Sequence, residues 1–267
     1  MLNRLLIFSF CVFVLNSCSS GGLHKTNSFK NKHEFQSQEL NQDTSSNGST
    51  TKMRLQEKLN AYAELAKAKI APEHKKVMIE SLQRLKNEQM EEDFPKIGDK
   101  ARNFELKNVN GEEIELYDVL DEKPVVLLFY RGSWCPYCNL ELKAYKDHYQ
   151  EFVDAGLEVI AISPEQTEYT AGFDQKNAFP FPLLFDRKSK VADKYDLKFT
   201  LDPELVPIYK EYGIDIGERN GDDDWEIPVP ATFIIAKDRT IKYVFADVDY
   251  KKRAEPESVL AVAKARL

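Results

Sequence analysis

Cysteine is scarce in this chain of 267 residues, with only four present, at positions 11, 18, 135 and 138. The first two lie in the amino-terminal leader, so Cys135 and Cys138 are the only thiols left for the folded part. A tetrahedral zinc site needs four ligands, and the domain expected around the pair offers only His148 in addition. A static disulfide across two intervening residues would constrain almost nothing in the unfolded chain. Both structural uses of the pair are therefore disfavoured.

Long hydrophobic runs and basic clusters are also missing. The apolar run from Leu5 to Leu15 is far shorter than the roughly 20 residues of a spanning helix. A formal net charge of −7 without a basic cluster argues against nucleic acid as a partner. The chain has no glycine-rich phosphate cradle and no Ser-His-Asp arrangement. We expect no metal and no bound cofactor.

The first 17 residues have the pattern of a secretion signal, with Arg4 before the apolar run. The following Leu15-Asn16-Ser17-Cys18 resembles the lipobox of bacterial lipoproteins. The resemblance implies that Cys18 carries a diacylglyceryl thioether and becomes the first mature residue. An ordinary cleaved signal and an uncleaved anchor are the alternatives. The protein is then expected in the cell envelope, held on a membrane by its lipid anchor.

The rest of the chain divides into three parts by composition. Residues 18–52 are rich in Ser, Asn, Gln, Lys and Gly, which predicts a flexible tether. Residues 53–93 carry apolar residues at spacings of three and four with a break at Ala71-Pro72, which predicts a helical hairpin extension. We assign no chemistry to that extension. Residues 94–267 are long enough for one α/β domain.

Alternating strand and helix patterns in residues 94–267 predict a mixed central sheet flanked by helices. Asn110-Gly111 indicates a hairpin between two short strands. The apolar runs 124–130 and 157–162 predict buried strands, and the helix expected between them makes a right-handed parallel crossover. The remaining predicted strands are 182–185, 230–235 and 241–245, and the remaining helices are 167–177, 188–195 and 256–267.

The segment Trp134-Cys135-Pro136-Tyr137-Cys138 lies where the first buried strand passes into its helix. Unpaired backbone N–H groups and the helix macrodipole stabilise an anion there, so the Cys135 thiolate is favoured. Pro136 suits the first helical position. Cys138 lies one turn later, within reach of an adduct on Cys135. Trp134 is expected to shield one side of the pair, and the spacing predicts a reversible disulfide switch.

Several blocks together resemble the peroxiredoxin-like branch of the alkyl hydroperoxide reductase and thiol-specific antioxidant family, within the thioredoxin superfamily. The blocks are residues 129–138, 162–164, 179–186 and 229–235. The resemblance implies a thioredoxin-like fold, a hydroperoxide substrate and a thioredoxin-like or other thiol reductant. It also implies that Pro230 is a cis-proline beside the sulfurs, in a strand that continues through Thr232.

This chain departs from the family pattern at the sulfurs themselves. Aligned on Phe129-Tyr130, the peroxide-attacking cysteine falls on Cys138, and Cys135 replaces the usual threonine. Arg131 replaces a shielding proline, and the arginine usual near Pro230 is absent. Arg131 either stabilises a thiolate and polarises a peroxide oxygen or is a solvated loop residue. The family alignment makes Cys138 the nucleophile, whereas the thioredoxin-like order makes it Cys135.

Two reactions fit the pair. In the first, a thiol-dependent peroxidase reduces hydrogen peroxide and organic hydroperoxides through a sulfenic acid and a disulfide. In the second, an envelope thioredoxin-like oxidoreductase exchanges with protein disulfides. Binding of a partner without turnover has no positive sequence signal. Among the remaining residues, Asp222 to Trp225 are interpreted as a solvated loop, and Glu141 and Glu165 as surface carboxylates able to relay protons.

Overall fold

The computed structural model describes residues 53–267. The predicted leader, the lipidated Cys18 and the tether lie outside the described residues, so those expectations stay predictions. From residue 53 onward, no helix is both long and apolar enough to cross a membrane.

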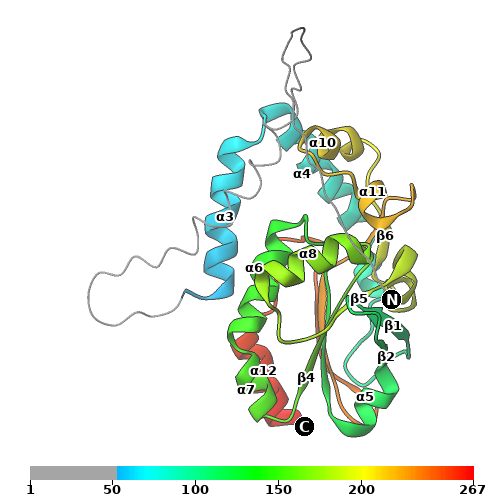
Figure 1. Ribbon diagram of the computed structural model, residues 1–267. Helices are drawn as coiled ribbons and strands as arrows, with labels where there is room; N and C mark the ends of the chain where they lie inside the picture. The colour runs from blue at the N-terminus through cyan, green and yellow to red at the C-terminus, as the bar shows by residue number, and fades with distance from the viewer. Residues whose placement is uncertain (1–52) are drawn as a thin grey trace, which may run out of the picture.

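A seven-stranded mixed sheet forms the centre of the molecule (Figure 1), in the order β2-β1-β5-β4-β3-β8-β9. The three middle strands run parallel: β3 (Val125–Phe129), β4 (Glu158–Ser163) and β5 (Leu183–Phe185). The outer strands pair antiparallel: β1 (Glu105–Asn108), β2 (Glu113–Glu115), β8 (Ala231–Ile235) and β9 (Ile241–Ala246). The predicted mixed sheet with a thioredoxin-like arrangement is confirmed.

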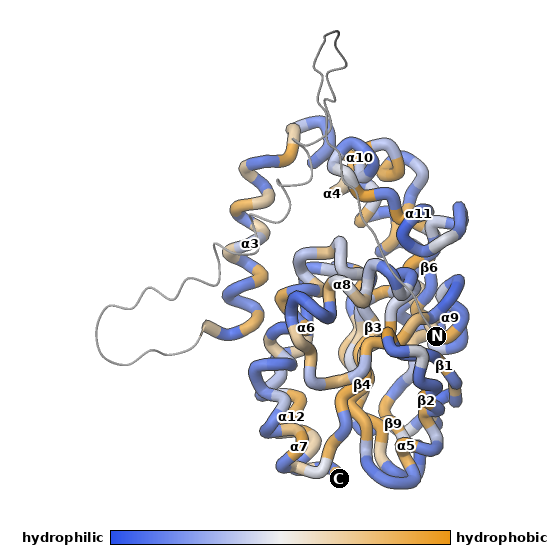
Figure 2. The backbone as a smooth tube through the Cα atoms, in the orientation of Figure 1, coloured by the Kyte–Doolittle hydropathy of each residue, from blue (hydrophilic) through white to orange (hydrophobic). Residues whose placement is uncertain are grey.

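Both faces of the sheet are covered, because successive residues of a strand point to opposite sides. In β3, Val126 and Leu128 pack on one face, and Val125, Leu127 and Phe129 pack on the other. The first face is covered by α6 (Pro136–Asp147), α7 (Tyr149–Asp154) and α12 (Pro256–Arg266). The second is covered by α5 (Leu116–Glu122) and α9 (Lys190–Lys194). Figure 2 shows the hydrophobic residues concentrated along the central strands.

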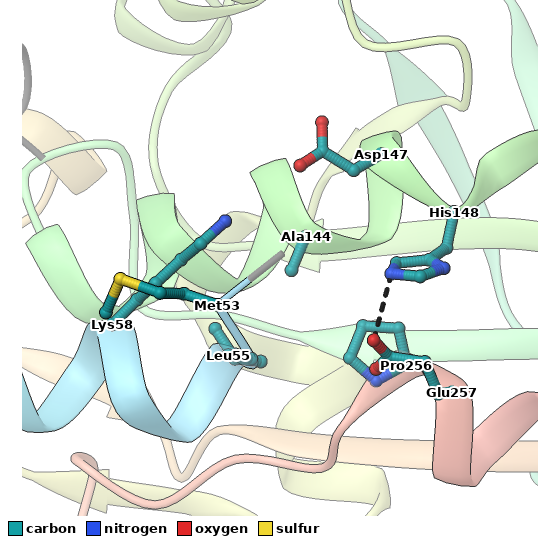
Figure 3. A pocket seen from close by; sticks show the side chains of 8 residues that line it. All are labelled: Met53, Leu55, Lys58, Ala144, Asp147, His148, Pro256 and Glu257. Atoms are coloured by element: carbon teal, nitrogen blue, oxygen red, sulfur yellow. Dashed lines mark ion pairs between the residues drawn. The ribbon is translucent and has the colours of Figure 1, made fainter. Parts of the chain in front are cut away.

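The crossover from β3 through α6 to β4 positions the cysteine pair at the start of α6, as the sequence predicts. The helix expected to continue to about Phe152 is instead divided at His148, whose backbone leaves the helical region. Its ring is held by Glu151, 2.8 Å from Nδ1, and by Glu257 of α12, 3.2 Å from Nε2. Figure 3 shows this ring directed at Glu257. Met53 and Leu55, at the start of the amino-terminal extension, line the same pocket.

The amino-terminal extension consists of α3 (Leu55–Lys69) and α4 (Pro72–Asn87), with the break at the predicted Ala71-Pro72. Each helix packs on the main body: α3 against α6, and α4 against the insertion helix α10 (Leu205–Glu211). In Figure 1 the two helices diverge from the short turn that joins them. The carboxylate of Glu255 accepts the first backbone N–H groups of α3, those of Leu55 at 3.0 Å and Gln56 at 2.8 Å.

An ordered insertion between residues 198 and 228 was not predicted from the sequence. Its elements are β6 (Lys198–Thr200), α10, α11 (Ile216–Asn220) and β7 (Glu226–Pro228). The two strands pair with each other. Trp225, 8 % exposed, is buried in a separate small hydrophobic core formed by residues of the insertion. The interpretation of Asp222 to Trp225 as a solvated loop is therefore wrong at Trp225, although Asp223 and Asp224 are exposed.

The remaining elements are short or match the predicted ranges. Helix α8 (Thr167–Asn177) has the predicted bounds, and η1 (Met90–Glu92) and η2 (Arg187–Ser189) are single 3-10 turns. Helix α5 was not predicted, because its seven residues follow β2 without a turn signal.

Candidate active site

The two cysteines lie within one turn at the start of α6. Cys135 is the N-cap residue, and Cys138 is the third residue of the helix after Pro136 and Tyr137. The two Sγ atoms are 2.9 Å apart, well beyond the roughly 2.05 Å of a disulfide bond, so both side chains are free thiols. Both are buried, Cys135 being 2 % and Cys138 0 % exposed.

The two sulfurs have opposite acidities. Burial alone would raise the pKa of Cys135, but the hydrogen bond donated by Cys138 and the charges of Arg131 and Arg253 lower it to about 6. Burial raises the pKa of Cys138, and the hydrogen bond to Cys135 and the negative charge on that sulfur raise it further. Cys135 is thus the sulfur that ionises, and Cys138 is the donor that stabilises its thiolate.

Arg131 is buried beside the pair, only 3 % exposed, so its interpretation as a solvated loop residue is wrong. Its Nη2 donates to the hydroxyl of Tyr209 at 2.8 Å. Its guanidinium carbon lies 4.7 Å from the ring centroid of Trp134 and 4.4 Å from that of Tyr250. Aromatic faces stabilise a cation electrostatically, which keeps this charge close to the sulfurs in a buried place.

Trp134 contacts both Arg131 and the insertion. Its ring meets that of Tyr209 edge to face, with centroids 5.9 Å apart. Gly132 makes room for it, since a Cβ there would lie 2.4 Å from Trp134 Nε1, and its φ of +142° is one that L side chains rarely adopt. The indole therefore packs on the arginine as well as on the cluster that contains the cysteines.

Pro230 is buried immediately before β8. It lines a groove together with Arg131, Tyr209 and Tyr250, and most of the other lining side chains are apolar ones from α4 and the insertion. Thr232 lies deeper in the sheet, opposite Leu128 of β3, and is 1 % exposed. The structure thus brings Pro230 to the groove beside Arg131 and places Thr232 in the sheet interior.

Arg253, which sequence reasoning missed, contacts the second sulfur. Its Nη2 lies 3.5 Å from Cys138 Sγ, and its Nε donates to Glu141 Oε2 at 2.7 Å. Glu141 is 2 % exposed, so its interpretation as a surface carboxylate is wrong. Burial raises the pKa of Glu141, against the lowering effect of Arg253. No local pattern marks Arg253, because it comes from a polar segment more than a hundred residues after the pair.

Glu165, interpreted as a surface carboxylate, is also buried, at 0 % exposed. One of its oxygens accepts the backbone N–H of Ser133 at 2.7 Å, and the other accepts Arg219 Nη1 at 2.7 Å. Arg219 belongs to α11 of the insertion. This carboxylate therefore ties the loop before Cys135 to the insertion.

The extension covers the dipeptide between the cysteines. The ring of Tyr62 on α3 meets that of Tyr137 edge to face at 5.1 Å, and Tyr137 in turn meets Tyr250 at 5.4 Å. Burial and the negative charge of Cys135 raise the pKa of Tyr62 to about 12. The extension, to which the sequence assigned no chemistry, is part of the wall around the sulfurs.

Metal binding finds no support in the part of the chain that the structure describes. In residues 53–267, no three His, Cys, Asp or Glu side chains are grouped so that they could hold an ion. His148, the one further ligand considered for the pair, is engaged by Glu151 and Glu257.

Sequence comparison finds similarity to one protein family and to several thiol-dependent oxidoreductases. The sequence model of the AhpC/TSA family matches residues 97–244. Peroxiredoxin Bcp of Bacillus subtilis is 35% identical over 101 residues, which cover 38% of this chain and 64% of that protein. The thiol-disulfide oxidoreductase ResA of Halalkalibacterium halodurans is 34% identical over 102 residues, covering 38% of this chain and 57% of ResA. The chain thus spans less than two thirds of the length of each of these two relatives, 64% of Bcp and 57% of ResA.

Solved structures agree with this likeness. Peroxidoxin BcpB from Mycobacterium tuberculosis superposes with a TM-score of 0.50 and 26% identity, covering 64% of this chain and 97% of that one. A yeast mitochondrial 1-Cys peroxiredoxin, at 22% identity and a TM-score of 0.51, shares the fold and covers 64% of this chain and 76% of its own. The chain therefore belongs to the AhpC/TSA family.

Proposed function

We propose that the protein is a thiol-dependent peroxidase that reduces hydrogen peroxide and organic hydroperoxides, with Cys135 as the attacking sulfur. One observation carries the proposal: Cys135 is the N-cap residue of α6, 2.9 Å from the sulfur of Cys138. The hydrogen bond from Cys138 and the charges of Arg131 and Arg253 lower the pKa of Cys135, although its burial opposes this. The thiolate is the reactive form of cysteine. A second sulfur 2.9 Å away is in place to capture the oxidised product.

The reaction has two steps on the protein. The Cys135 thiolate attacks one peroxide oxygen; the S–O bond forms as the O–O bond breaks, and the departing oxygen takes a proton and leaves as water or an alcohol. Cys138 then attacks the sulfenic sulfur; the S–S bond forms, the S–O bond breaks, and the thiol proton leaves with the hydroxide as water. An external dithiol, proposed to be thioredoxin-like, returns the pair to the reduced form by exchange.

Burial of the pair favours a small oxidant. Cys135 is 2 % exposed, and the rings of Tyr62 and Tyr137 pack against each other beside the pair. A hydroperoxide has few atoms, and the groove lined by Arg131 is the proposed place where it binds. A protein disulfide would have to bring its own backbone to the Cys135 thiolate, which this reduced conformation obstructs. The proposed reductant acts on the oxidised pair instead.

Thiol-disulfide exchange is the second candidate. The likeness to ResA, a thiol-disulfide oxidoreductase, favours it. So does the order of the two sulfurs, since the acidic one stands at the helix start and the other follows one turn later. In this reaction Cys135 attacks a substrate disulfide and Cys138 resolves the mixed disulfide.

The proposed location is the cell envelope, on the membrane side to which a lipid on Cys18 would anchor the chain. The lipobox-like Leu15-Asn16-Ser17-Cys18 after an apolar leader supports this proposal.

Turnover with two substrates separates the candidate functions. We expect reduced protein supplied with a dithiol to consume hydrogen peroxide and tert-butyl hydroperoxide, and Cys135→Ser to lose this activity by about 100-fold or more. Reduction of insulin disulfides, assayed beside it, should be slow. Rapid insulin reduction together with negligible peroxide consumption would replace the peroxidase by the disulfide-exchange candidate.

A further inference from the structure

Arg253 and Glu141 form a buried ion pair against the second sulfur of the site. The side chain of Arg253 is 1 % exposed and that of Glu141 2 %. The Nε of Arg253 donates to Glu141 Oε2 at 2.7 Å, and its Nη2 lies 3.5 Å from Cys138 Sγ. Its Nη1 donates to the backbone carbonyls of Tyr250 and Lys252. All three nitrogens are therefore engaged, and the one that faces the sulfur is fixed in direction.

A buried ion pair is weak evidence for stability, because removing two charges from water carries a large desolvation cost. An apolar pair of the same volume would fill this space at no such cost. The feature that a packing role leaves unexplained is the third contact, where Arg253 directs a donor at Cys138. That contact indicates a role in the chemistry of the sulfur.

Cys138 needs such help because its surroundings oppose ionisation. It is 0 % exposed and donates to the negative sulfur of Cys135. Five ionisable groups of the described residues interact electrostatically with Cys138. They are Cys135 at the start of α6, Glu141 within that helix, Tyr130 directly after β3, Arg131 in the loop that follows, and Arg253 before α12. Only the two arginines favour its thiolate.

The two arginines differ in their other partners. Arg131 is bonded to the hydroxyl of Tyr209 and lies over two aromatic rings at the groove. Arg253 is the one with a donor within 3.5 Å of Cys138 Sγ. The family's usual arginine near Pro230 is absent from this chain, and Arg253 comes from a different segment.

We propose that Arg253, held in direction by Glu141, is the positioning residue that stabilises the Cys138 thiolate as this sulfur attacks the oxidised Cys135. Oxidation of Cys135 to a sulfenic acid removes the negative charge that holds Cys138 protonated, while the positive charge of Arg253 stays. The second sulfur is thereby activated only after the first has reacted. The timing rests on the proposed peroxidase cycle, whereas the effect on ionisation holds for disulfide exchange as well.

The first test measures Cys138 alone, in the Cys135→Ser background, by the pH dependence of its alkylation with iodoacetamide. We expect Arg253→Met to move the midpoint to higher pH and to slow alkylation at pH 8 about tenfold, equivalent to one pKa unit. Arg253→Lys keeps the charge and should recover part of the rate. Lys252→Met, which removes an exposed neighbouring charge, is the matched control and should leave the midpoint unchanged.

The second test uses both cysteines and one equivalent of hydrogen peroxide. Trapping with dimedone should find more sulfenic acid on Cys135 in Arg253→Met than in the wild type, because Cys138 resolves it more slowly. The double variant Arg253→Met with Glu141→Gln leaves no unpaired buried charge, so it should fold like the wild type and still show the slow resolution.

An alkylation midpoint of Cys138 that is the same with and without Arg253, in either the single or the double variant, overturns the proposal. Because alkylation requires no peroxide, a midpoint shift in a protein without peroxidase activity would leave this inference standing and overturn the proposed function alone.

Discussion

At the residue scale, Arg131, in the loop after β3, favours the thiolate of Cys135 four residues later. It is buried and packed on two aromatic rings. Its charge and the charge of Arg253 both lower the pKa of Cys135. Replacing it by Met removes the charge and keeps much of the packing volume. We expect the pKa of Cys135 to rise from about 6 by about one unit, equivalent to 1.4 kcal/mol. Because a thiol loses its thiolate as pH falls through its pKa, alkylation at pH 7 should slow.

The measurement is the ultraviolet absorbance of the Cys135 thiolate in Cys138→Ser, titrated with and without Arg131→Met. Arg131→Lys, with the same charge on a shorter side chain, should lie between the two curves. Superimposable curves would show that Arg131 does not act on this sulfur.

At the scale of elements, α3 covers the active-site dipeptide, although it lies outside the segment that matches the family. Tyr62→Ala removes the ring that meets Tyr137, and we expect it to raise insulin-disulfide reduction and alkylation by bulky maleimides severalfold. Hydrogen peroxide consumption should change little, because a small oxidant does not need the opening. Leu65→Ala, on the exposed side of α3 at 46 % exposed, is the control. Equal rates for Tyr62→Ala and the control would contradict a covering role for α3.

Some of these elements could be predicted from the sequence and others could not. The strand run 124–130, the proline after Cys135 and the alternation of strand and helix predict β3, α6 and β4 because each depends on local patterns. The strands and helices of the insertion were missed because its short strands pair only with each other, and Trp225 gains its burial from α10 and α11. Arg253 and Glu165 were missed as buried groups for a related reason: their partners are distant in sequence, so no spacing marks them.

At the scale of the whole molecule, the proposed lipid on Cys18 would fix the enzyme to a membrane through residues 18–52. Cys18→Ser removes the acceptor sulfur, so we expect the protein to move from the membrane fraction to the soluble fraction of lysed cells. Two acyl chains hold a protein stably on a bilayer, whereas one does not. Fractionation with immunodetection checks this, with Cys11→Ser as the matched control that should stay with the membrane. A Cys18→Ser variant that stays with the membrane would exclude this anchor.

The central claim is that Cys135 is the acidic sulfur that attacks peroxide and Cys138 is the sulfur that resolves it. Single-turnover stopped-flow reaction with hydrogen peroxide, measured across pH for Cys138→Ser and Cys135→Ser, tests it most directly. The account predicts a fast reaction in Cys138→Ser with a midpoint below the ordinary thiol pKa, because Arg131 and Arg253 remain and the serine hydroxyl can still donate to Cys135. It predicts essentially no reaction in Cys135→Ser. A fast reaction retained in Cys135→Ser and lost in Cys138→Ser would contradict it.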